Sequence, residues 1–329
     1  MNCKKCGEPL NDVDKFCEAC GTKVQSEELS NGVSEILKDK FYCNCGLGNG
    51  KPDEDGYCEI CGMKMVEKSE KQLEENVEEI SKELAMVSNI GKRHIANEDS
   101  GRVLISKKGA EILIVADGVS SSINATSASS KAVQIIGDIL MEYDFGQDPE
   151  ELLIKAIDSA HKAIIDLTSG EETKECDGPE TTIVAAINDE DQIIIGWVGD
   201  SRAYLIDEDK EIQLTVDDSW VEEMVRDGQL TREAAMNDKR AHYITQVLGM
   251  KDDDIDIHTS KMQNKTEKML LLCSDGLWNY FQREGELAKV ISDYKNKEAL
   301  KLCHFFVDKA NICGGHDNIT VAILMPKEK

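Results

Sequence analysis

Acidic residues stand at the ends of at least five short apolar runs in this chain of 329 residues. The run EILIVA (111–116) leads directly into Asp117, and KMLLLCS (268–274) leads into Asp275, each followed by a glycine. One Asp-Gly pair alone usually marks a turn. Five acidic strand ends restrict the fold more strongly, because carboxylates that converge at one edge repel one another unless a cation binds between them.

The other acidic strand ends have the same placement. Asp200 follows QIIIGWV, Asp317 precedes ITVAILM, and the pair Glu98 and Asp99 comes just after an early apolar run at 85–90. Carboxylate oxygens are hard ligands, which select Mg²⁺, Mn²⁺ or Ca²⁺ over zinc. Two such ions that share a carboxylate can activate a water molecule and hold a phosphoryl oxygen. The pattern therefore predicts a site for hard divalent cations.

The order of apolar runs and amphipathic segments predicts an α+β protein. Strand candidates between residues 183 and 206 follow one another through short connections, which is typical of antiparallel sheets. We therefore expect antiparallel sheets with helices packed outside them, rather than a repeat of βαβ units. The candidate strands are 85–90, 111–116, 181–187, 192–198, 202–206, 268–274 and 319–325, and the candidate helices are 124–143, 149–168, 219–227 and 297–310.

Eight of the twelve cysteines lie near the N-terminus, in close pairs that end in glycine. No apolar signal segment precedes them, so close pairs indicate metal ligands rather than disulfides. Two C-x2-C turns can present four thiolates to one Zn²⁺ ion. We expect residues 1–24 to form a zinc ribbon whose folding depends on the metal. Its ligands, with the spacing C-x2-C-x10-C-x2-C, are Cys3, Cys6, Cys17 and Cys20.

A second module at 41–66 departs from this spacing, because only one residue separates its first two cysteines. We expect a second, irregular zinc ribbon; a different ligand set or a degenerate site is the alternative, so the chain binds one or two Zn²⁺. Both modules are acidic, which favours a protein partner over nucleic acid. The expected ligands are Cys43, Cys45, Cys58 and Cys61.

Residues 67–84 are expected to form a charged helical linker, because Leu73, Val77, Ile80 and Leu84 follow a helical 4-3-4 spacing. The apolar face of this helix would dock on the following domain or mediate self-association. The remaining residues, 85–329, are long enough to form one large domain.

The formal net charge of −26 argues against binding to nucleic acid or to an anionic membrane surface. No apolar run approaches the length of a membrane span. The absence of a secretory signal predicts a cytoplasmic location. The acidity is typical of a solvated surface, and part of it would converge on bound cations.

Several motifs, in one order across residues 86–325, resemble the protein phosphatase 2C family of metal-dependent serine/threonine phosphatases. Each motif alone is modest, but the ordered set is specific. No Cys-x5-Arg loop, which a cysteine phosphatase needs, is present. The matching stretches are Asn97-Glu98-Asp99, VADGV (115–119), ETTIVAAI (180–187), VGDSRAYL (198–205), ITQVLG (244–249), LLCSDGLW (271–278) and GGHDNITVAIL (314–324).

The resemblance implies an αββα sandwich of two packed antiparallel sheets flanked by helices, with a binuclear Mn²⁺ or Mg²⁺ centre at one end. Water activated by the ions would hydrolyse phosphoserine and phosphothreonine in protein substrates directly. Carried over by position, Asp117 would bridge two ions. Asp275 and Asp317 would complete the shell of the first ion, and Glu98 and the Gly118 carbonyl would hold the second ion. Asp99 would act through water, Asp200 with Asp275 would bind a third, weaker ion, and Asn318 would support Asp317.

Three positions depart from the family pattern. The family often has a phosphate-gripping arginine where this chain has His94, with Arg93 beside it. Guanidinium geometry favours Arg93 over His94 for the substrate phosphate. No histidine stands at position 119 to act as a general acid, and Asp218 replaces a common histidine. The alternative function is a catalytically weak, phosphatase-like signalling or docking module.

Overall fold

The structure is a computed structural model, and it describes the chain from residue 75 onward with short gaps, together with one small N-terminal strand pair. Its described ranges are 41–42, 66–67, 75–122, 124–168, 178–190, 192–207, 210–251, 255–263, 268–294 and 298–326. The strand pair is β1 Phe41–Tyr42 with β2 Val66–Glu67. The eight cysteines of the predicted zinc ribbons lie outside the described residues, so these ligand sets stay predictions.

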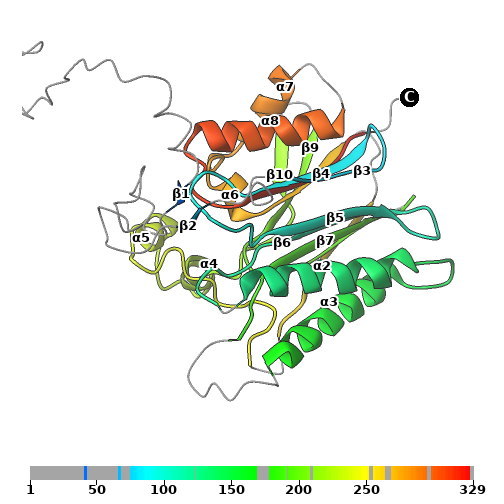
Figure 1. Ribbon diagram of the computed structural model, residues 1–329, viewed down its shortest axis with the longest axis horizontal. Coiled ribbons are helices and arrows are strands. Elements are labelled where there is room, and N and C mark those ends of the chain that lie inside the picture. The colour runs from blue at the N-terminus through cyan, green and yellow to red at the C-terminus, as the bar shows by residue number, and fades with distance from the viewer. Residues whose placement is uncertain are drawn as a thin grey trace, which may run out of the picture.

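Two antiparallel sheets pack face to face, with helices on both outer sides (Figure 1). This is the αββα sandwich expected from the sequence. The six-stranded sheet, in spatial order, contains β10 Lys210–Gln213, β9 Arg202–Asp207, β12 Met269–Cys273, β13 Ile319–Leu324, β4 Leu84–Asn89 and β3 Asn76–Glu79. The five-stranded sheet contains β11 His258–Gln263, β8 Gln192–Val198, β7 Ile183–Asn188, β6 Glu111–Ala116 and β5 Ser100–Ile105.

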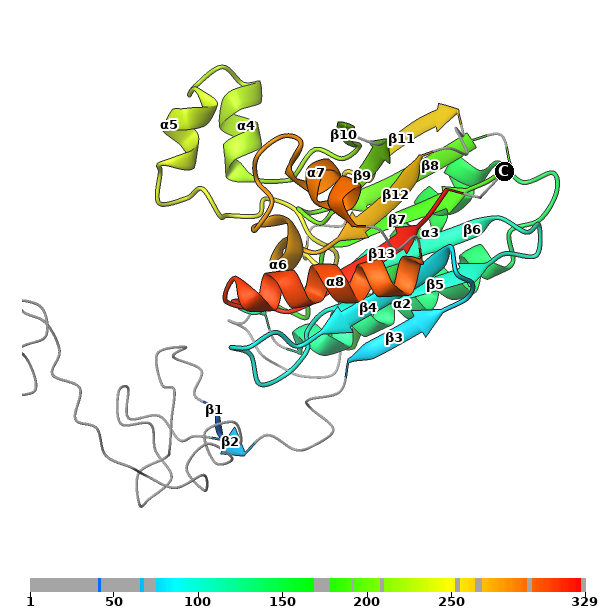
Figure 2. The ribbon, with the colours of Figure 1, turned by 90° about the horizontal axis from the view of Figure 1, so that it is seen from above.

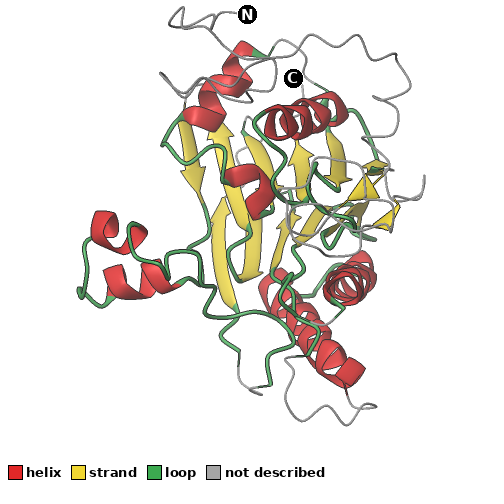
Figure 3. Ribbon diagram, turned by 60° about the vertical axis from the view of Figure 1, so that its left-hand side comes forward, coloured by secondary structure: helices red, strands yellow, loops and turns green. Residues whose placement is uncertain are grey.

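The helices divide between the two outer faces. α2 and α3 cover the five-stranded sheet, and α7 and α8 cover the six-stranded one (Figure 1). α4 and α5 project from one end of the sandwich (Figures 2 and 3). The helices are α2 Ala125–Met141, α3 Pro149–Ile165, the short 3-10 helix η2 Asp166–Thr168, α4 Trp220–Arg226, α5 Arg232–Met236, α6 Asp275–Trp278, α7 Glu286–Asp293 and α8 Ala299–Ile312.

Alternation along the central strands builds three apolar layers. In β7, Ile183, Ala185 and Ile187 face α2 and α3, whereas Val184 and Ala186 face the other sheet. Successive side chains of a strand point to opposite faces, so a strand covered on both sides reads as a continuous apolar run. This burial explains why the sequence identified the central strands. Among the described residues, no helix is both long and apolar enough to cross a membrane.

The helix predicted over residues 67–84 is wrong for the described residues. Asn76–Glu79 forms β3, which pairs with β4 at the edge of the six-stranded sheet. The apolar spacing does not produce a buried face, because Val77 and Ile80 are 40% and 49% exposed. Pairing with β4 and a bond from the Val103 N–H to Glu78 Oε2 (2.9 Å) hold the segment instead. The large domain therefore includes β3 and does not begin at residue 85.

Three further strands, β5, β10 and β11, were not expected from the sequence, because β10 and β11 are largely polar and β5 begins with Ser100, Gly101 and Arg102. β10 and β11 are edge strands, and edge strands need only one apolar face. β5 carries Arg102, whose guanidinium lies 3.0 Å from Asp138 Oδ1 on α2. Tertiary pairing stabilises these strands, which their local sequence does not indicate.

A polar cluster closes the end of the sandwich where β6 begins and β7 ends. Asp189 is almost fully buried and accepts hydrogen bonds from Lys108 Nζ (2.5 Å) and Tyr143 Oη (2.8 Å). Burial alone would raise the pKa of Asp189, but these two bonds outweigh it, and the pKa lies below its ordinary value. The ionised carboxylate therefore stabilises the folded state.

We expect Asp189→Asn to lower the free energy of unfolding at pH 7 by about 1–3 kcal/mol, because it removes a charge-assisted pair. A depressed folded-state pKa contributes stability that is present above the unfolded pKa and is lost as pH falls through the folded pKa. The difference between variant and wild type should therefore shrink below about pH 4. Urea unfolding at several pH values measures this. Asp158→Asn, in an exposed pair with Lys162, is the control and should change little.

Candidate functional site

The strand pairings bring the acidic strand ends of the five-stranded sheet together. β5 and β6 are antiparallel, with Ser100 opposite Ala116. Asp99, which precedes β5, and Asp117, which follows β6, therefore lie at the same end of this sheet. The carbonyl of Asp117 also accepts a bond from the Thr182 N–H (2.8 Å) just before β7, which fixes the strand end.

The six-stranded sheet supplies the other acidic residues at its matching end. β12 runs into Asp275, and its antiparallel neighbours β9 and β13 begin there, just after Asp200 and Asp317 respectively. Asp275 opens α6, and its Oδ2 accepts a bond from Asn279 Nδ2 (3.2 Å). The fold therefore gathers the carboxylates that the sequence identified, from strands far apart in the chain.

Burial and mutual repulsion perturb these carboxylates strongly. Burial raises the pKa of Asp117 well above its ordinary value, and the nearby charges of Asp99, Asp275, Asp200 and Asp317 raise it further. Burial also raises the pKa of Asp275 to about 6, with the charge of Asp317 adding to the effect. Such a group of acids is neutralised either by protonation or by bound cations.

Asp99 is held differently from its neighbours. Ser274 Oγ donates a 2.7 Å hydrogen bond to Asp99 Oδ2 across the two sheets. Burial raises the pKa of Asp99 to about 7, although the bonds from Ser274 and Thr320 favour the ionised form. Hydroxyl groups thus fix the carboxylate of Asp99, whereas the carboxylate of Asp117 is surrounded by other carboxylates.

Two glycines allow the turns of the site to approach one another closely. A Cβ atom at position 276 would lie 1.8 Å from the carbonyl oxygen of Asn318, and one at position 118 would lie 2.6 Å from that of Glu98. Both neighbours are backbone atoms, which cannot move aside as a flexible side chain can. The Asp-Gly pairs of the sequence are therefore needed for packing between loops as well as for turning.

Asn318 ties the loop before β13 to three positions of the loop between β4 and β5. Its Nδ2 donates to the carbonyls of Ile90 (2.9 Å) and Ala96 (3.1 Å), and its Oδ1 accepts from the Glu98 N–H (2.8 Å). Its own N–H donates to Asp317 Oδ1 (2.8 Å). The side chain is almost fully buried. Asn318 therefore orients both Glu98 and Asp317, as the resemblance implied for Asp317.

Glu98 lies at the mouth of the site. Its Oε2 accepts a 2.5 Å bond from Ser120 Oγ, in the loop that follows Gly118. The Gly118 N–H donates to the Glu98 carbonyl (3.2 Å). Ser120 thus fixes the Glu98 side chain.

The two candidate phosphate-binding cations separate in the structure. His94 Nε2 lies 3.2 Å from Asp317 Oδ1. Arg93 instead donates from its Nη2 to His316 Nε2 at 3.2 Å and is exposed. His94, rather than the Arg93 that guanidinium geometry favoured, therefore lies beside the carboxylates.

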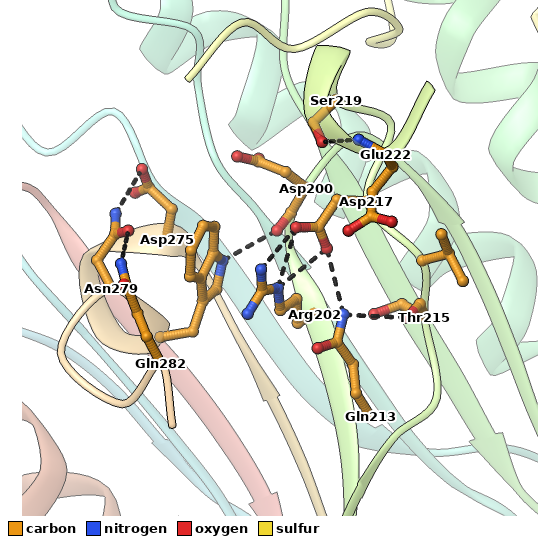
Figure 4. Close-up of polar contacts among 12 residues, drawn as sticks. Asp200, Arg202, Gln213, Thr215, Asp217, Ser219, Glu222, Asp275, Asn279 and Gln282 are labelled. Carbon is orange, nitrogen blue, oxygen red and sulfur yellow. Dashed lines mark hydrogen bonds and ion pairs between the residues drawn. The ribbon is translucent and has the colours of Figure 1, made fainter. Parts of the chain in front are cut away.

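A cavity of about 490 Å³ adjoins the acidic residues, and Asp200 and Asp275 line its inner wall. Trp278 and Arg202 stack in the cavity wall, with the guanidinium carbon 3.6 Å from the ring centroid. Arg202 also pairs with Asp217 at 2.6 Å. Figure 4 shows Arg202 and Asp217 between Asp275 on one side and Glu222 of α4 on the other. The segment 216–245, which includes α4 and α5, closes the opposite side.

Asp218 and His258 fix this segment, and His258 was not among the residues predicted for the site. Asp218 Oδ2 accepts from the Gly199 N–H (2.8 Å), and its Oδ1 lies 2.8 Å from His258 Nε2 on β11. The Gly199 loop carries Asp200, so the base of the projecting segment is tied to the acidic site. The departure from the family pattern at position 218 was the only sequence signal of this pair.

The donor set fits hard divalent cations. All its side-chain donors are carboxylate oxygens, and Asp200 Oδ1 is buried with no hydrogen-bond partner in the described part of the chain. The described residues do not contain three or more His, Cys, Asp or Glu side chains already in the arrangement of a formed metal site. The acids are close enough for the charges of Asp200, Asp275 and Asp317 to raise the pKa of Asp117.

Comparison with known proteins identifies the family of this chain. The protein phosphatase 2C family matches residues 90–300, and a zinc-ribbon domain family matches residues 2–24. A serine/threonine phosphatase of Listeria innocua is 37% identical over 232 residues, which cover 69% of this chain and 89% of that protein. Protein phosphatase PhpP of Streptococcus pneumoniae is 29% identical over 75% of this chain and 98% of its own.

Solved structures show the same similarity. A serine/threonine phosphatase of S. agalactiae superposes with a TM-score of 0.66 at 28% identity, covering 77% of this chain and all of that one. The Mycobacterium tuberculosis phosphatase PstP gives a TM-score of 0.64 at 25% identity, over 74% and 98% of the two chains. A sandwich of this kind, with acids at one end and these relatives, defines a serine/threonine protein phosphatase. The chain belongs to the protein phosphatase 2C family.

We expect Asn318→Asp to lower the free energy of unfolding by about 2–4 kcal/mol, because a carboxylate cannot donate to the two buried carbonyls that Asn318 now satisfies. Phosphatase activity should fall with it, since Glu98 and Asp317 lose their common support. Asn237→Asp, at an exposed helix end, should change stability by less than about 0.5 kcal/mol. Equal thermal unfolding of the two variants would contradict the role of Asn318.

Proposed function

We propose that the chain hydrolyses phosphoserine and phosphothreonine in proteins at a binuclear Mn²⁺ or Mg²⁺ centre at the acidic end of the sandwich. The observation that carries this proposal is the set of buried carboxylates with raised pKa values around Asp117. Such a set is unfavourable unless cations neutralise it. The ions, when bound, supply an activated water and offset the charge of the phosphoryl group.

The chain's own residues divide the remaining tasks. Asp117 would bridge the two ions; Asp275 and Asp317 would hold one, and Glu98 with the Gly118 carbonyl would hold the other. Asp99, fixed by Ser274, would orient water.

A third, weaker ion would use Asp200 together with Asp275. The buried Asp200 Oδ1 without a hydrogen-bond partner supports this assignment.

We propose that His94 binds the phosphate being hydrolysed, because it lies beside Asp317. Val119 cannot donate a proton to the leaving group, so that proton would come from solvent.

The cavity next to Asp200 and Asp275 gives the substrate chain a place to lie. Its wall combines the Trp278 ring and Val221 with polar groups such as Gln213 and Asn279. A wall of this mixed character suits an extended peptide better than a small apolar ligand. The protein substrates therefore would approach between the segment 216–245 and α6.

Asp275→Asn and Asp317→Asn should each lower kcat by about 100-fold or more on phosphothreonine peptides, because each removes a ligand of the ion that activates water. EDTA should abolish turnover by the wild type, and Mn²⁺ or Mg²⁺ should restore it. The measurement is phosphate release at saturating metal, with thermal unfolding to show that the variants are folded.

Asp207→Asn is the matched control. Asp207 ends β9 at the opposite end from Asp200 and is 45% exposed beside Lys268. Its kcat should stay within about twofold of wild type, as for a surface substitution. Full activity of Asp275→Asn, or of the wild type in EDTA, would overturn the assignment. Metal binding without turnover would instead indicate a phosphatase-like docking module.

We further propose that residues 1–66 hold two zinc ribbons that dock a protein partner and can be separated from catalysis. The match of residues 2–24 to a zinc-ribbon family supports the first ribbon. The phosphatase match begins only at residue 90. The irregular spacing of Cys43 and Cys45 makes the second ribbon the weaker assignment.

A fragment of residues 1–66 should carry about two zinc ions by elemental analysis, one for each set of four thiolates. A single ion would mean that the second ribbon is degenerate.

A chain beginning at residue 75 keeps β3 and should hydrolyse small aryl phosphates at the wild-type rate. A chain beginning at residue 85 exposes the edge of β4 and should unfold at a lower temperature, since each lost backbone hydrogen bond costs about 1 kcal/mol.

A further inference from the structure

Arg93 differs from the other arginines of this acidic chain. All seven arginines of the sequence lie in the described residues. Six of them form an ion pair with aspartate or glutamate: Arg102, Arg202, Arg226, Arg232, Arg240 and Arg283. Arg93 has no carboxylate partner among the described residues, and the side-chain contact recorded for it is the His316 imidazole. The chain has 64 acidic and 38 basic residues, yet within its described part this guanidinium lacks a counter-charge.

The position of Arg93 connects it to the phosphatase site. Arg93 precedes His94 in one loop, and its partner His316 precedes Asp317 in another. The Arg93–His316 contact therefore lies next to the His94–Asp317 contact, between the same two loops. The Lys92 N–H donates to the Gly315 carbonyl (2.9 Å) and holds these loops together. Consecutive Cα atoms are about 3.8 Å apart, so Arg93 lies about one residue outward from the acidic centre.

The guanidinium is oriented without being neutralised. Arginine is always charged, so its N–H donates and His316 Nε2 accepts. The backbone N–H of His316 donates in turn to Tyr280 Oη (3.0 Å), and the two rings lie 6.3 Å apart. Tyr280 follows α6, whose first residue is Asp275. The remaining N–H donors of Arg93 are therefore held in an exposed position at the rim of the site.

Charge decides what this rim can bind. His94 already faces Asp317. Arg93 and the neighbouring exposed Lys92 form no ion pair with a described residue. An acidic side chain of a substrate would be repelled by a protein of net charge −26 unless a local cation received it. A guanidinium fork matches a carboxylate or a phosphate through two parallel hydrogen bonds.

We propose that Arg93, with Lys92 beside it, forms a subsite for a second anionic side chain of the substrate, next to the phosphoserine or phosphothreonine being hydrolysed. Glutamate, aspartate and a second phosphorylated residue share the chemistry that this subsite recognises. His316 is the positioning residue that aims the guanidinium. The inference rests on the proposed function and adds a preference for acidic or multiply phosphorylated sequences to it.

The test uses the full-length protein with Mn²⁺ and three phosphothreonine peptides of equal length. Their flanking residues, on both sides, are glutamine, glutamate or phosphoserine. The wild type should show a kcat/KM about tenfold higher for the glutamate peptide than for the glutamine peptide, which is the size of one charge-assisted hydrogen bond. The difference should lie mainly in KM. Because flanking phosphoserines are themselves substrates of the proposed activity, loss of the phosphothreonine phosphate is followed by mass spectrometry, and its rate in the phosphoserine peptide shows whether a second phosphate is preferred over a carboxylate.

Arg93→Gln should lower the ratio of the glutamate to the glutamine peptide from about ten to about one, because the neutral amide keeps hydrogen bonding but loses the charge. Arg93→Lys should retain part of the preference. His316→Ala should weaken it while leaving the charge in place. Lys155→Gln, on the exposed side of α3, controls for a general change in net charge and should leave the ratio as in wild type.

Two results would overturn the proposal. A wild type that hydrolyses all three peptides equally well has no such subsite. An Arg93→Gln variant that lowers kcat/KM equally for every peptide and for an aryl phosphate would place Arg93 on the scissile phosphate instead. In both cases metal-dependent hydrolysis by the wild type persists, whereas failure of the proposed function would appear as no hydrolysis of any substrate.

Discussion

The mutual repulsion of buried carboxylates at one end of the sandwich is the constraint on which the structure depends. Asp117, Asp200 and Asp275 lie where burial disfavours their ionised forms, and the charges of Asp200 and Asp275 raise the pKa of Asp117 further. An isolated chain segment could not keep such groups together. Three apolar layers, one between the sheets and one under each helical face, fix the strand ends that carry them.

The loops of the site are held mainly by backbone contacts. Gly276 lets the turn after β12 touch the carbonyl of Asn318, and the Asn318 side chain satisfies three backbone groups in turn. These bonds are buried, so their loss leaves unpaired polar groups rather than hydrated ones. The site is therefore rigid where ions are expected. The segment 216–245 is anchored separately, through Asp218 and His258.

Charge is distributed so that the few cations have separate tasks. Arg202 is neutralised by Asp217 and stacks on Trp278, which makes it part of the cavity wall. His94 faces the acidic centre, and Arg93 faces outward beside it. Arg93 has no carboxylate partner among the described residues, and we propose that it receives an anionic side chain of the substrate. The difference between adjacent positions 93 and 94 thus separates chemistry from recognition of the surrounding sequence.

The sequence by itself determined the central strands, the long helices and the carboxylates of the site. Strands buried on both faces, such as β7, must be continuously apolar. Several acidic residues at the ends of such strands indicate a common site, although one Asp-Gly pair alone does not. Tertiary structure decided the rest. β3 resembles a helix in its apolar spacing, but pairing with β4 makes it a strand. Guanidinium chemistry favoured Arg93 for the phosphate, whereas loop packing placed His94 beside Asp317. Local patterns fix which residues are buried or charged; long-range contacts between loops fix where each side chain points.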